Sequence, residues 1–217
     1  MLRKIAMAAA RSLWSAGCVG CETGDILGRY VMYKKLGEQF AGRDLGDRVL
    51  SISHSRKLCT LLGAQESAIL DANYPEHSLA DLAFAANSFS AVVSDQVLEH
   101  IACPPEQAVA EVFRVLRPGG FAVHTTAFMM GYHGAADFSD LDNGDFWRFS
   151  PSGLIRLHAR YAEVIAADGW GNVLIPLLGG LGLLLAPVPK ASWHPFNKLA
   201  RLNRPSYAWV VWIIARK

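Results

Sequence analysis

Strand-like apolar runs alternate with helix-like segments through most of the chain, and this alternation constrains the fold more than any other feature. The predicted strands cover residues 47–53, 67–71, 89–94, 121–126, 162–167 and 207–214. The predicted helices cover residues 1–17, 29–41, 55–62, 104–116 and 150–160. Alternating strands and helices predict an α/β fold with a doubly wound, mostly parallel sheet.

Local motifs mark some of the boundaries in this pattern. Ser150-Pro-Ser152 places a capping serine and a proline at the start of the last predicted helix. Arg117-Pro-Gly-Gly120 predicts a turn before the strand over 121–126. We expect an N-terminal helical lead-in over residues 1–46 and one well-cored domain over residues 47–217.

An uncharged stretch interrupts the domain before its last strand. Residues 169–189 contain no Asp, Glu, Lys or Arg, and residues 190–217 contain six Lys or Arg and no acidic residue. The apolar part, 173–188, is shorter than the about 20 residues that a membrane-spanning helix needs. We therefore predict an apolar insertion over about 171–205 that covers a substrate pocket or contacts an anionic membrane peripherally.

Charge and cysteine content limit the remaining function classes. The formal net charge of +2 argues against nucleic acid as a partner. A single Cys18-Val-Gly-Cys21 pair fits ordinary thiols of a reducing compartment rather than a structural metal site. Arg11 interrupts the N-terminal apolar stretch, which leaves it shorter than a secretion signal. These features predict a cytoplasmic protein that is either free or associated with a membrane through its insertion.

Polar side chains follow the predicted strands where ligands bind in sheets of this kind. Ser53 and His54 follow the first strand, Asp71 ends the second, and Asp95 and Gln96 follow the third. In open α/β sheets, ligands lie at the carboxyl ends of the strands, near the switch point of the strand order. We expect these side chains to lie around one site.

Four motifs in the middle of the chain together resemble one enzyme family. They are Asp81-Leu-Ala-Phe84, Asn87-Ser-Phe89, Val93-Ser-Asp-Gln-Val-Leu-Glu-His100 and Glu111-Val-Phe-Arg-Val-Leu-Arg-Pro-Gly-Gly120. In this order and spacing the chain resembles the class I S-adenosylmethionine-dependent methyltransferases over residues 48–167, most closely those that modify small molecules and sugars. The resemblance implies a Rossmann-like methyltransferase fold and S-adenosylmethionine as the cofactor.

The resemblance also implies roles for residues around the cofactor. Asp71 would accept hydrogen bonds from the ribose hydroxyls, because a carboxylate can take both at once. Asp81 and Leu82 would lie against the adenine. Asp95 and Gln96 would border the methionine part and the methyl group.

The segment from Leu98 to His100 would begin the part of the chain that packs beneath the cofactor. An alternative is that Glu99 and His100 cap the helix that follows.

The first loop departs from the family pattern. The family has an acidic, glycine-rich turn after the first strand, and here Ser53-His54-Ser55 stands in its place. Each side chain takes space that glycine leaves free, and residues other than glycine resist positive φ angles. Asp81 follows Asp71 by only ten positions, which leaves little room for the usual helix between them. We still expect Ser53 and His54 to border the cofactor, in a pocket altered on this side.

The acceptor side is expected after the strand over 121–126. His133 could take a proton from an attacking hydroxyl, because its ordinary pKa lies near neutrality, and Asp95 is a second candidate for that role. In the segment Asp145-Phe-Trp-Arg-Phe-Ser-Pro151, Arg148 could hold an anionic acceptor group and Trp147 could stack on a ring. The alternative is that Trp147 and Phe149 belong to the core and Arg148 pairs with Asp145.

Four aspartates gather in the same region. Asp137, Asp140, Asp142 and Asp145 do not match the calcium-loop pattern. We expect a solvated acidic loop and no metal site there.

Two functions from different classes fit these features. The first is methyl transfer from S-adenosylmethionine to a small-molecule, sugar or lipid-linked glycan acceptor, as in polysaccharide biosynthesis. The second is a catalytically inactive methyltransferase-like scaffold with a binding or regulatory role, favoured by the degenerate loop. The sequence leaves the acceptor and the oligomeric state open.

Overall fold

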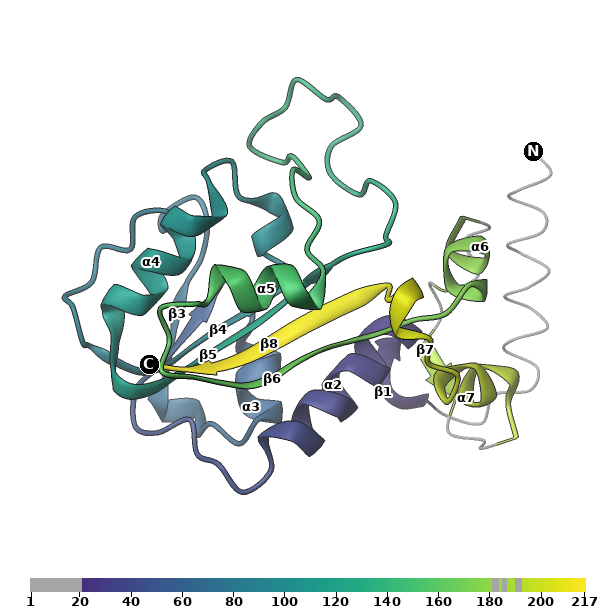
Figure 1. Cartoon of the computed structure of the whole chain (residues 1–217), viewed down its shortest axis with the longest axis horizontal. Helices are drawn as coiled ribbons and strands as arrows, with labels where there is room; N and C mark the ends of the chain where they lie inside the picture. The colour runs from purple at the N-terminus through teal and green to yellow at the C-terminus, as the bar shows by residue number, and fades with distance from the viewer. Residues whose placement is uncertain (1–20, 181–183, 185–186, 190–192) are drawn as a thin grey trace.

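The computed structural model describes residues 21–180, 184, 187–189 and 193–217, and is built around one six-stranded sheet (Figure 1). The order of the strands across this sheet is β3-β2-β4-β5-β8-β6. Their bounds are β2 Val49–Ile52, β3 Ile69–Ala72, β4 Phe89–Asp95, β5 Leu116–Ala127, β6 Glu163–Trp170 and β8 Val210–Arg216. A second, two-stranded sheet pairs β1 (Cys21–Ile26) with β7 (Pro187–Pro189).

The direction of the strands confirms the predicted sheet. Strands β3, β2, β4 and β5 run parallel to one another, and β8 runs antiparallel to both β5 and β6. This arrangement is the mostly parallel, doubly wound sheet that the sequence predicts. The carboxyl ends of the four parallel strands meet at one edge of the sheet, which is where the site lies.

Helices cover both faces of the sheet (Figure 1). The helices are α2 (Leu27–Phe40), α3 (Arg56–Leu61), α4 (Pro105–Val115), α5 (Pro151–Leu157), α6 (Leu174–Gly180) and α7 (Pro195–Ala200). Val93 and Val123 face a core shared with α2 and α3, while Val92 and Ala122 face a second core shared with α4 and α5. This alternation follows from the two-residue period of strand side chains.

Most predicted elements have counterparts with slightly different bounds. The expected cap of α5 is confirmed, because the Ser150 side chain accepts a hydrogen bond from Gly153 N and Pro151 opens the helix. The prediction that a helix has little room between Asp71 and Asp81 is also confirmed. The segment between β3 and β4 contains only turns and an isolated bridge from Ser78 to Asp81.

One local prediction is wrong. Arg117-Pro-Gly-Gly120 is not a separate turn but part of β5, which starts at Leu116. Gly119 takes a positive φ of 80° and its amide donates to Lys217 O at 2.7 Å, so the chain irregularity is absorbed within the strand. The register shift between Phe89 and Ala91 on β4 marks the same place.

The structure adds to the predictions for the N-terminal segment and the insertion. The predicted helix over residues 1–17 lies outside the described residues. Helix α2, assigned by sequence to the lead-in over 1–46, packs against β6 and β8 of the sheet. The insertion over 171–205 contains α6, β7 and α7, which lie beyond one end of the sheet in Figure 1. In the described part of the chain, no helix is long and apolar enough to cross a membrane.

Candidate functional site

The loop after β2 keeps a glycine-like backbone without glycine. Ser53 and His54 have φ angles of +46° and +66°, a left-handed conformation that costs each such residue about 1–3 kcal/mol. Two side chains support it. Asn73 Oδ1 accepts from His54 N at 2.9 Å, and the buried Ser55 hydroxyl accepts from Asp95 N at 2.8 Å. Residues other than glycine disfavour positive φ angles, but these hydrogen bonds to residues of the neighbouring strands stabilise them here.

Asp71 ends β3 beside the following helix. Arg56 donates from Nε at 2.9 Å and from a terminal nitrogen at 2.7 Å, both to Asp71 Oδ2. Oδ1 is buried and has no hydrogen-bond partner. Burial acts to raise the pKa of Asp71, but the Arg56 guanidinium outweighs it and lowers that pKa. The carboxylate is therefore ionised with one acceptor oxygen unused.

A first cavity of about 440 Å³ lies at the carboxyl ends of β2, β3 and β4. It is bordered by Ser53, by the 74–80 segment and by the 96–103 segment. Of the other residues predicted to bind the cofactor, only Gln96 lines it. His54 and Asp81 are exposed outside its lining, and Leu82 is buried in the second core.

Asp95 and Gln96 lie together after β4. Asp95 accepts from Tyr33 at 2.5 Å and from Thr125 at 2.6 Å, and lies 3.8 Å from Arg29. Gln96 has a φ of +56°. In the amide orientation that satisfies its neighbours, Gln96 accepts from Thr126 N at 3.1 Å and donates to Glu99 Oε1 at 3.1 Å. Each oxygen of the Asp95 carboxylate thus accepts a hydrogen bond from a protein hydroxyl.

A second cavity of about 410 Å³ lies on the other side of Gln96 and His100. It is lined further by the start of α2, by Trp209 and Val210, and by Met130 and His133. Gln96 and His100 therefore form a wall between the two cavities. His133, from the loop after β5, lines this second cavity, and its place on an acceptor side stays a prediction.

Hydrogen bonds hold His133 in one orientation. Its Nδ1 lies 3.1 Å from Gly131 O and 3.1 Å from Asp145 Oδ2, and its backbone N donates to Asp145 Oδ2 at 2.9 Å. Both neighbours of Nδ1 are acceptors, so Nδ1 carries the proton and Nε2 keeps a lone pair. Burial acts to raise the pKa of Asp145, but hydrogen bonds from Arg148 and His133 lower it.

Arg148 and Trp147 support the loop rather than line a cavity. The Arg148 guanidinium forms a fork on Asp145, with one bond of 2.6 Å, and its Nε donates to Met130 O at 3.1 Å. This is the pairing that the sequence left as an alternative. Trp147 Nε1 donates to Ile101 O at 2.8 Å, and the residue is 37% exposed, so it does not belong to the core. Phe149 packs against the second core.

Glu99 is the residue whose role the sequence did not indicate. It is fully buried on η2 (Leu98–His100), and its carboxylate accepts from Thr126 Oγ1 at 2.8 Å and Ala127 N at 3.2 Å. Its carbonyl oxygen accepts from the amides of Phe146 and Trp147. The start of α4 has no side-chain cap, so the expectation that Glu99 and His100 cap that helix is wrong. Burial raises the pKa of Glu99.

The predicted solvated acidic loop fits Asp137, Asp140 and Asp142 but is wrong for Asp145, whose side chain is buried and paired with Arg148. Asp137 and Asp140 bind Ser139 and Asn143 within the loop, and Asp142 accepts from Tyr74 at 2.9 Å.

Comparison with known families adds to this geometry. Residues 18–124, from ahead of α2 into β5, match the family model for a methyltransferase domain. The matched family is that of methyltransferases. Together with the sheet order, the match supports an S-adenosylmethionine-dependent methyltransferase and S-adenosylmethionine as its cofactor. A search of curated proteins found no match.

Solved structures share the fold at low sequence identity. A methyltransferase from Mesorhizobium loti that depends on S-adenosylmethionine aligns with a TM-score of 0.51 and 11% identity, over 86% of this chain and 98% of the other. The cyclase SpnF aligns with a TM-score of 0.51 and 14% identity, over 86% and 80%. Phosphoethanolamine N-methyltransferase 2 from Haemonchus contortus, in complex with S-adenosyl-L-methionine, aligns with a TM-score of 0.50 and 11% identity, over 86% and 52%.

Proposed function

We propose that this protein transfers a methyl group from S-adenosylmethionine to a hydroxyl of a small-molecule, sugar or lipid-linked glycan acceptor. The observation that carries the proposal is the pair of cavities that share the Gln96–His100 wall. The first cavity lies at the strand ends, where cofactors bind in such sheets. The second cavity lies across the wall and contains His133.

The first cavity fits a nucleoside-sized cofactor in volume and chemistry. Its 440 Å³ falls in the range of about 300–1,000 Å³ typical of small-molecule sites. Ser53 and Gln96 line this cavity and would border the cofactor. Asp71 lies at the end of the neighbouring strand β3, outside the cavity lining, and its Oδ1 is buried without a hydrogen-bond partner. When bound, S-adenosylmethionine supplies an already activated methyl group, so the protein's main task is to position the acceptor.

His133 is better placed than Asp95 to receive the acceptor's proton. Both Asp95 oxygens accept hydrogen bonds from Tyr33 and Thr125. His133 instead presents an Nε2 lone pair, because its Nδ1 proton is directed at Asp145 and Gly131 O. Arg148 and Trp147 act by holding this loop in place.

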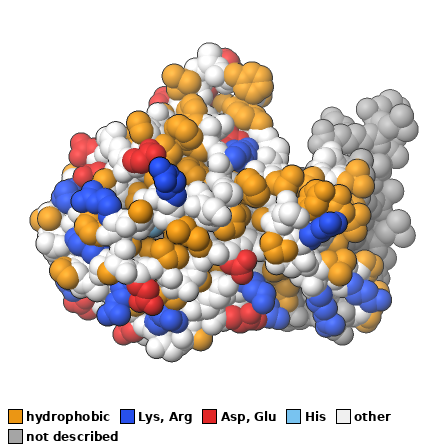
Figure 2. All heavy atoms as spheres, viewed as in Figure 1, with side chains coloured by type: hydrophobic (Ala, Val, Ile, Leu, Met, Phe, Trp, Pro, Cys, Tyr) orange, Lys and Arg blue, Asp and Glu red, His pale blue; other side chains and the backbone are white. Residues whose placement is uncertain are grey.

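The insertion supports a lipid-linked acceptor and peripheral membrane contact. Leu174, Leu177, Trp193 and Leu202 are exposed there, and an apolar groove of about 440 Å³ runs between α6 and α7. In the part of this segment that the structure describes, the exposed cations are Lys198, Arg201 and Arg204. Figure 2 shows hydrophobic side chains gathered around α6 with Lys and Arg nearby. Apolar groups flanked by cations suit an anionic membrane surface.

Calorimetric titration with S-adenosylmethionine and its demethylated product tests the proposed function. We expect both to bind the wild-type protein. If neither produces heat or a thermal shift at millimolar concentration, the enzyme proposal fails and the scaffold alternative stands.

A further inference from the structure

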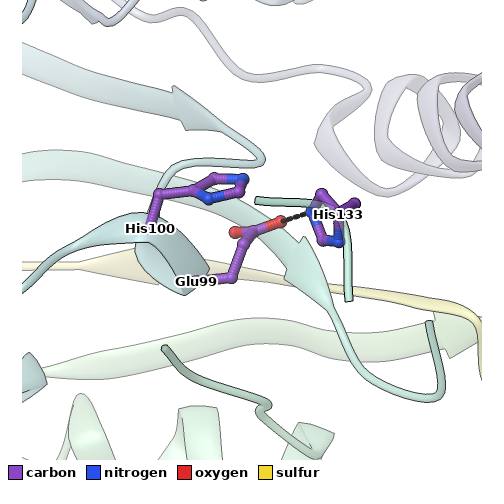
Figure 3. A group of neighbouring side chains, drawn as sticks. All are labelled: Glu99, His100 and His133. Atoms are coloured by element: carbon purple, nitrogen blue, oxygen red, sulfur yellow. Dashed lines mark ion pairs between the residues drawn. The ribbon is translucent and has the colours of Figure 1, made fainter. Parts of the chain in front are cut away.

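Three side chains of the types that bind transition metals converge on the wall of the second cavity. Glu99, His100 and His133 each offer a ligand atom, and these atoms all lie within 4.8 Å of one another. His133 Nε2 lies 3.9 Å from Glu99 Oε1. Figure 3 shows the Glu99 carboxylate between the two imidazole rings, with Glu99 and His100 from η2 and His133 from the loop after β5.

The hydrogen bonds of both histidines leave one nitrogen free for an ion. His100 Nδ1 lies 2.7 Å from Gly144 O, and His133 Nδ1 lies 3.1 Å from Asp145 Oδ2. Because these oxygens only accept, each Nδ1 carries a proton and each Nε2 carries the lone pair. Metal-binding histidines usually donate their second N–H to a carbonyl or carboxylate in this way, which fixes the tautomer and the ring.

The burial of the Glu99 carboxylate favours a cation at the same place. Its carboxylate is fully buried and accepts from Thr126 Oγ1, Ala127 N and the Gln96 amide, which are all neutral donors. Among the described residues, His133 is the one basic group within ion-pair distance of Glu99, with Nε2 3.9 Å from Oε1. The Arg148 guanidinium is paired with Asp145 instead. A buried carboxylate is costly unless a cation lies near it, and a divalent ion would supply that charge.

From this geometry we infer that Glu99, His100 and His133 bind a divalent transition-metal ion, with Zn²⁺ as the ion to test. One carboxylate and two imidazoles are a ligand set of catalytic zinc sites, which keep a further position open. Bonds of about 2.0–2.1 Å place tetrahedral ligand atoms about 3.4 Å apart. The three ligand atoms, which lie within 4.8 Å of one another, would therefore move closer together around a bound ion. His100 and His133 line the second cavity, from which an ion would reach them.

The inference goes beyond the proposed function and is tested without it. A bound ion would use the Nε2 lone pair of His133, and would then activate an acceptor hydroxyl in place of that nitrogen. Metal binding is measured on the protein alone, so its failure leaves S-adenosylmethionine binding and methyl transfer untouched.

The experiment is a Zn²⁺ titration of metal-stripped protein that lacks a histidine tag. Cys18 and Cys21 are replaced by serine in every sample, because their CxxC spacing can bind zinc independently. We expect one equivalent of Zn²⁺ to bind with micromolar or tighter affinity, and Mg²⁺ to bind far more weakly because it prefers oxygen ligands. His100→Ala and His133→Ala should each lower Zn²⁺ affinity at least tenfold.

Three further variants complete the design. His54→Asn removes an exposed histidine outside the cluster, at a positive φ that asparagine tolerates, and should bind Zn²⁺ like wild type. Asp145→Asn should weaken binding about 10–100-fold, since it alters the partner of His133 Nδ1. Glu99→Gln keeps the shape of the buried side chain and should also weaken binding. The inference is overturned if wild type binds no equivalent, or if His100→Ala and His133→Ala, folded by thermal melting, bind as tightly as wild type.

Discussion

At the scale of single residues, the site depends on hydrogen bonds that decide which atom of a side chain faces a cavity. His133 presents Nε2 because Asp145 and Gly131 O take up Nδ1. The sequence could indicate that a histidine follows the fourth parallel strand, but not that a carboxylate 12 positions later orients it. The role of Glu99 was harder still to predict from sequence, because its hydrogen-bond partners Thr126 and Ala127 lie on β5, far along the chain.

Replacing His133 tests its role in the chemistry. His133→Ala should lower turnover about 10²–10⁴-fold and leave S-adenosylmethionine affinity nearly unchanged, because the side chain borders only the second cavity. Steady-state kinetics and cofactor titration on the same preparation separate the two effects. Ser139→Ala, a change in the same loop at a residue that lines neither cavity, is the control. Full activity of His133→Ala would show that another group, or no group, takes the proton.

Replacing Asp71 tests the cofactor side. Asp71→Ala should weaken S-adenosylmethionine binding by about 2 kcal/mol, the scale of hydrogen bonds to a charged group. Glu66→Gln is the control, because it removes the other carboxylate that Arg56 binds while leaving Asp71 in place. Equal cofactor affinity of Asp71→Ala and wild type, measured by calorimetry, would remove Asp71 from the cofactor site.

At the scale of elements, strands and helices were predictable and their long-range pairing was less so. Hydrophobic runs indicated β2, β3, β4, β6 and β8, because strands that are buried on both faces of a sheet are rich in apolar residues. The extension of β5 through Arg117-Pro-Gly-Gly120 could not be predicted, since it depends on Lys217 at the far end of the chain.

Two buried histidines link β5 to α5 and make stability depend on pH. His124 bonds Ser94 through Nδ1 at 2.6 Å, and His158 bonds Leu154 O at 2.8 Å. In both rings Nε2 is buried without a partner. Burial lowers the pKa of His158 to about 4, and burial followed by the neighbouring His158 lowers that of His124 well below its ordinary value.

The sign of the effect follows from these shifts. The unfolded chain takes up a proton on His158 near pH 6.5, whereas the folded chain does so only near pH 4. The stabilisation is therefore complete above about pH 6.5 and is lost as pH falls, with His158 contributing on the order of 2 kcal/mol between pH 6.5 and 5. Urea unfolding at pH 7.5 and pH 5 measures this loss. His158→Phe should show a smaller loss than wild type; an unchanged loss would refute the assignment.

At the scale of the whole molecule, the apolar and basic segment lies at one end of the sheet, where α7 packs beside α2 (Figure 1). Composition alone indicated this segment, because 21 consecutive positions from 169 to 189 lack charge. Its arrangement as α6 and α7 around an apolar groove was not predictable, since glycines and prolines interrupt every periodic pattern there.

Membrane contact should depend on the cations of this segment. The wild-type protein should sediment in part with anionic liposomes, and less at high salt, because screening weakens the attraction. Charge reversal of Lys198, Arg201 and Arg204 to Glu should abolish sedimentation. The control reverses three exposed arginines elsewhere, Arg43, Arg156 and Arg160, and should sediment like wild type. Complete recovery of wild type in the supernatant at low salt would contradict the proposal.

The wall formed by Gln96 and His100 also has a thermodynamic consequence. Because the same two side chains border both cavities, a ligand that shifts either of them alters the neighbouring cavity as well. Such an effect is reciprocal: if the first ligand tightens binding of the second by some factor, the second tightens binding of the first by the same factor. The protein would then bind the two substrates cooperatively, with the affinity for each one depending on whether the other is bound.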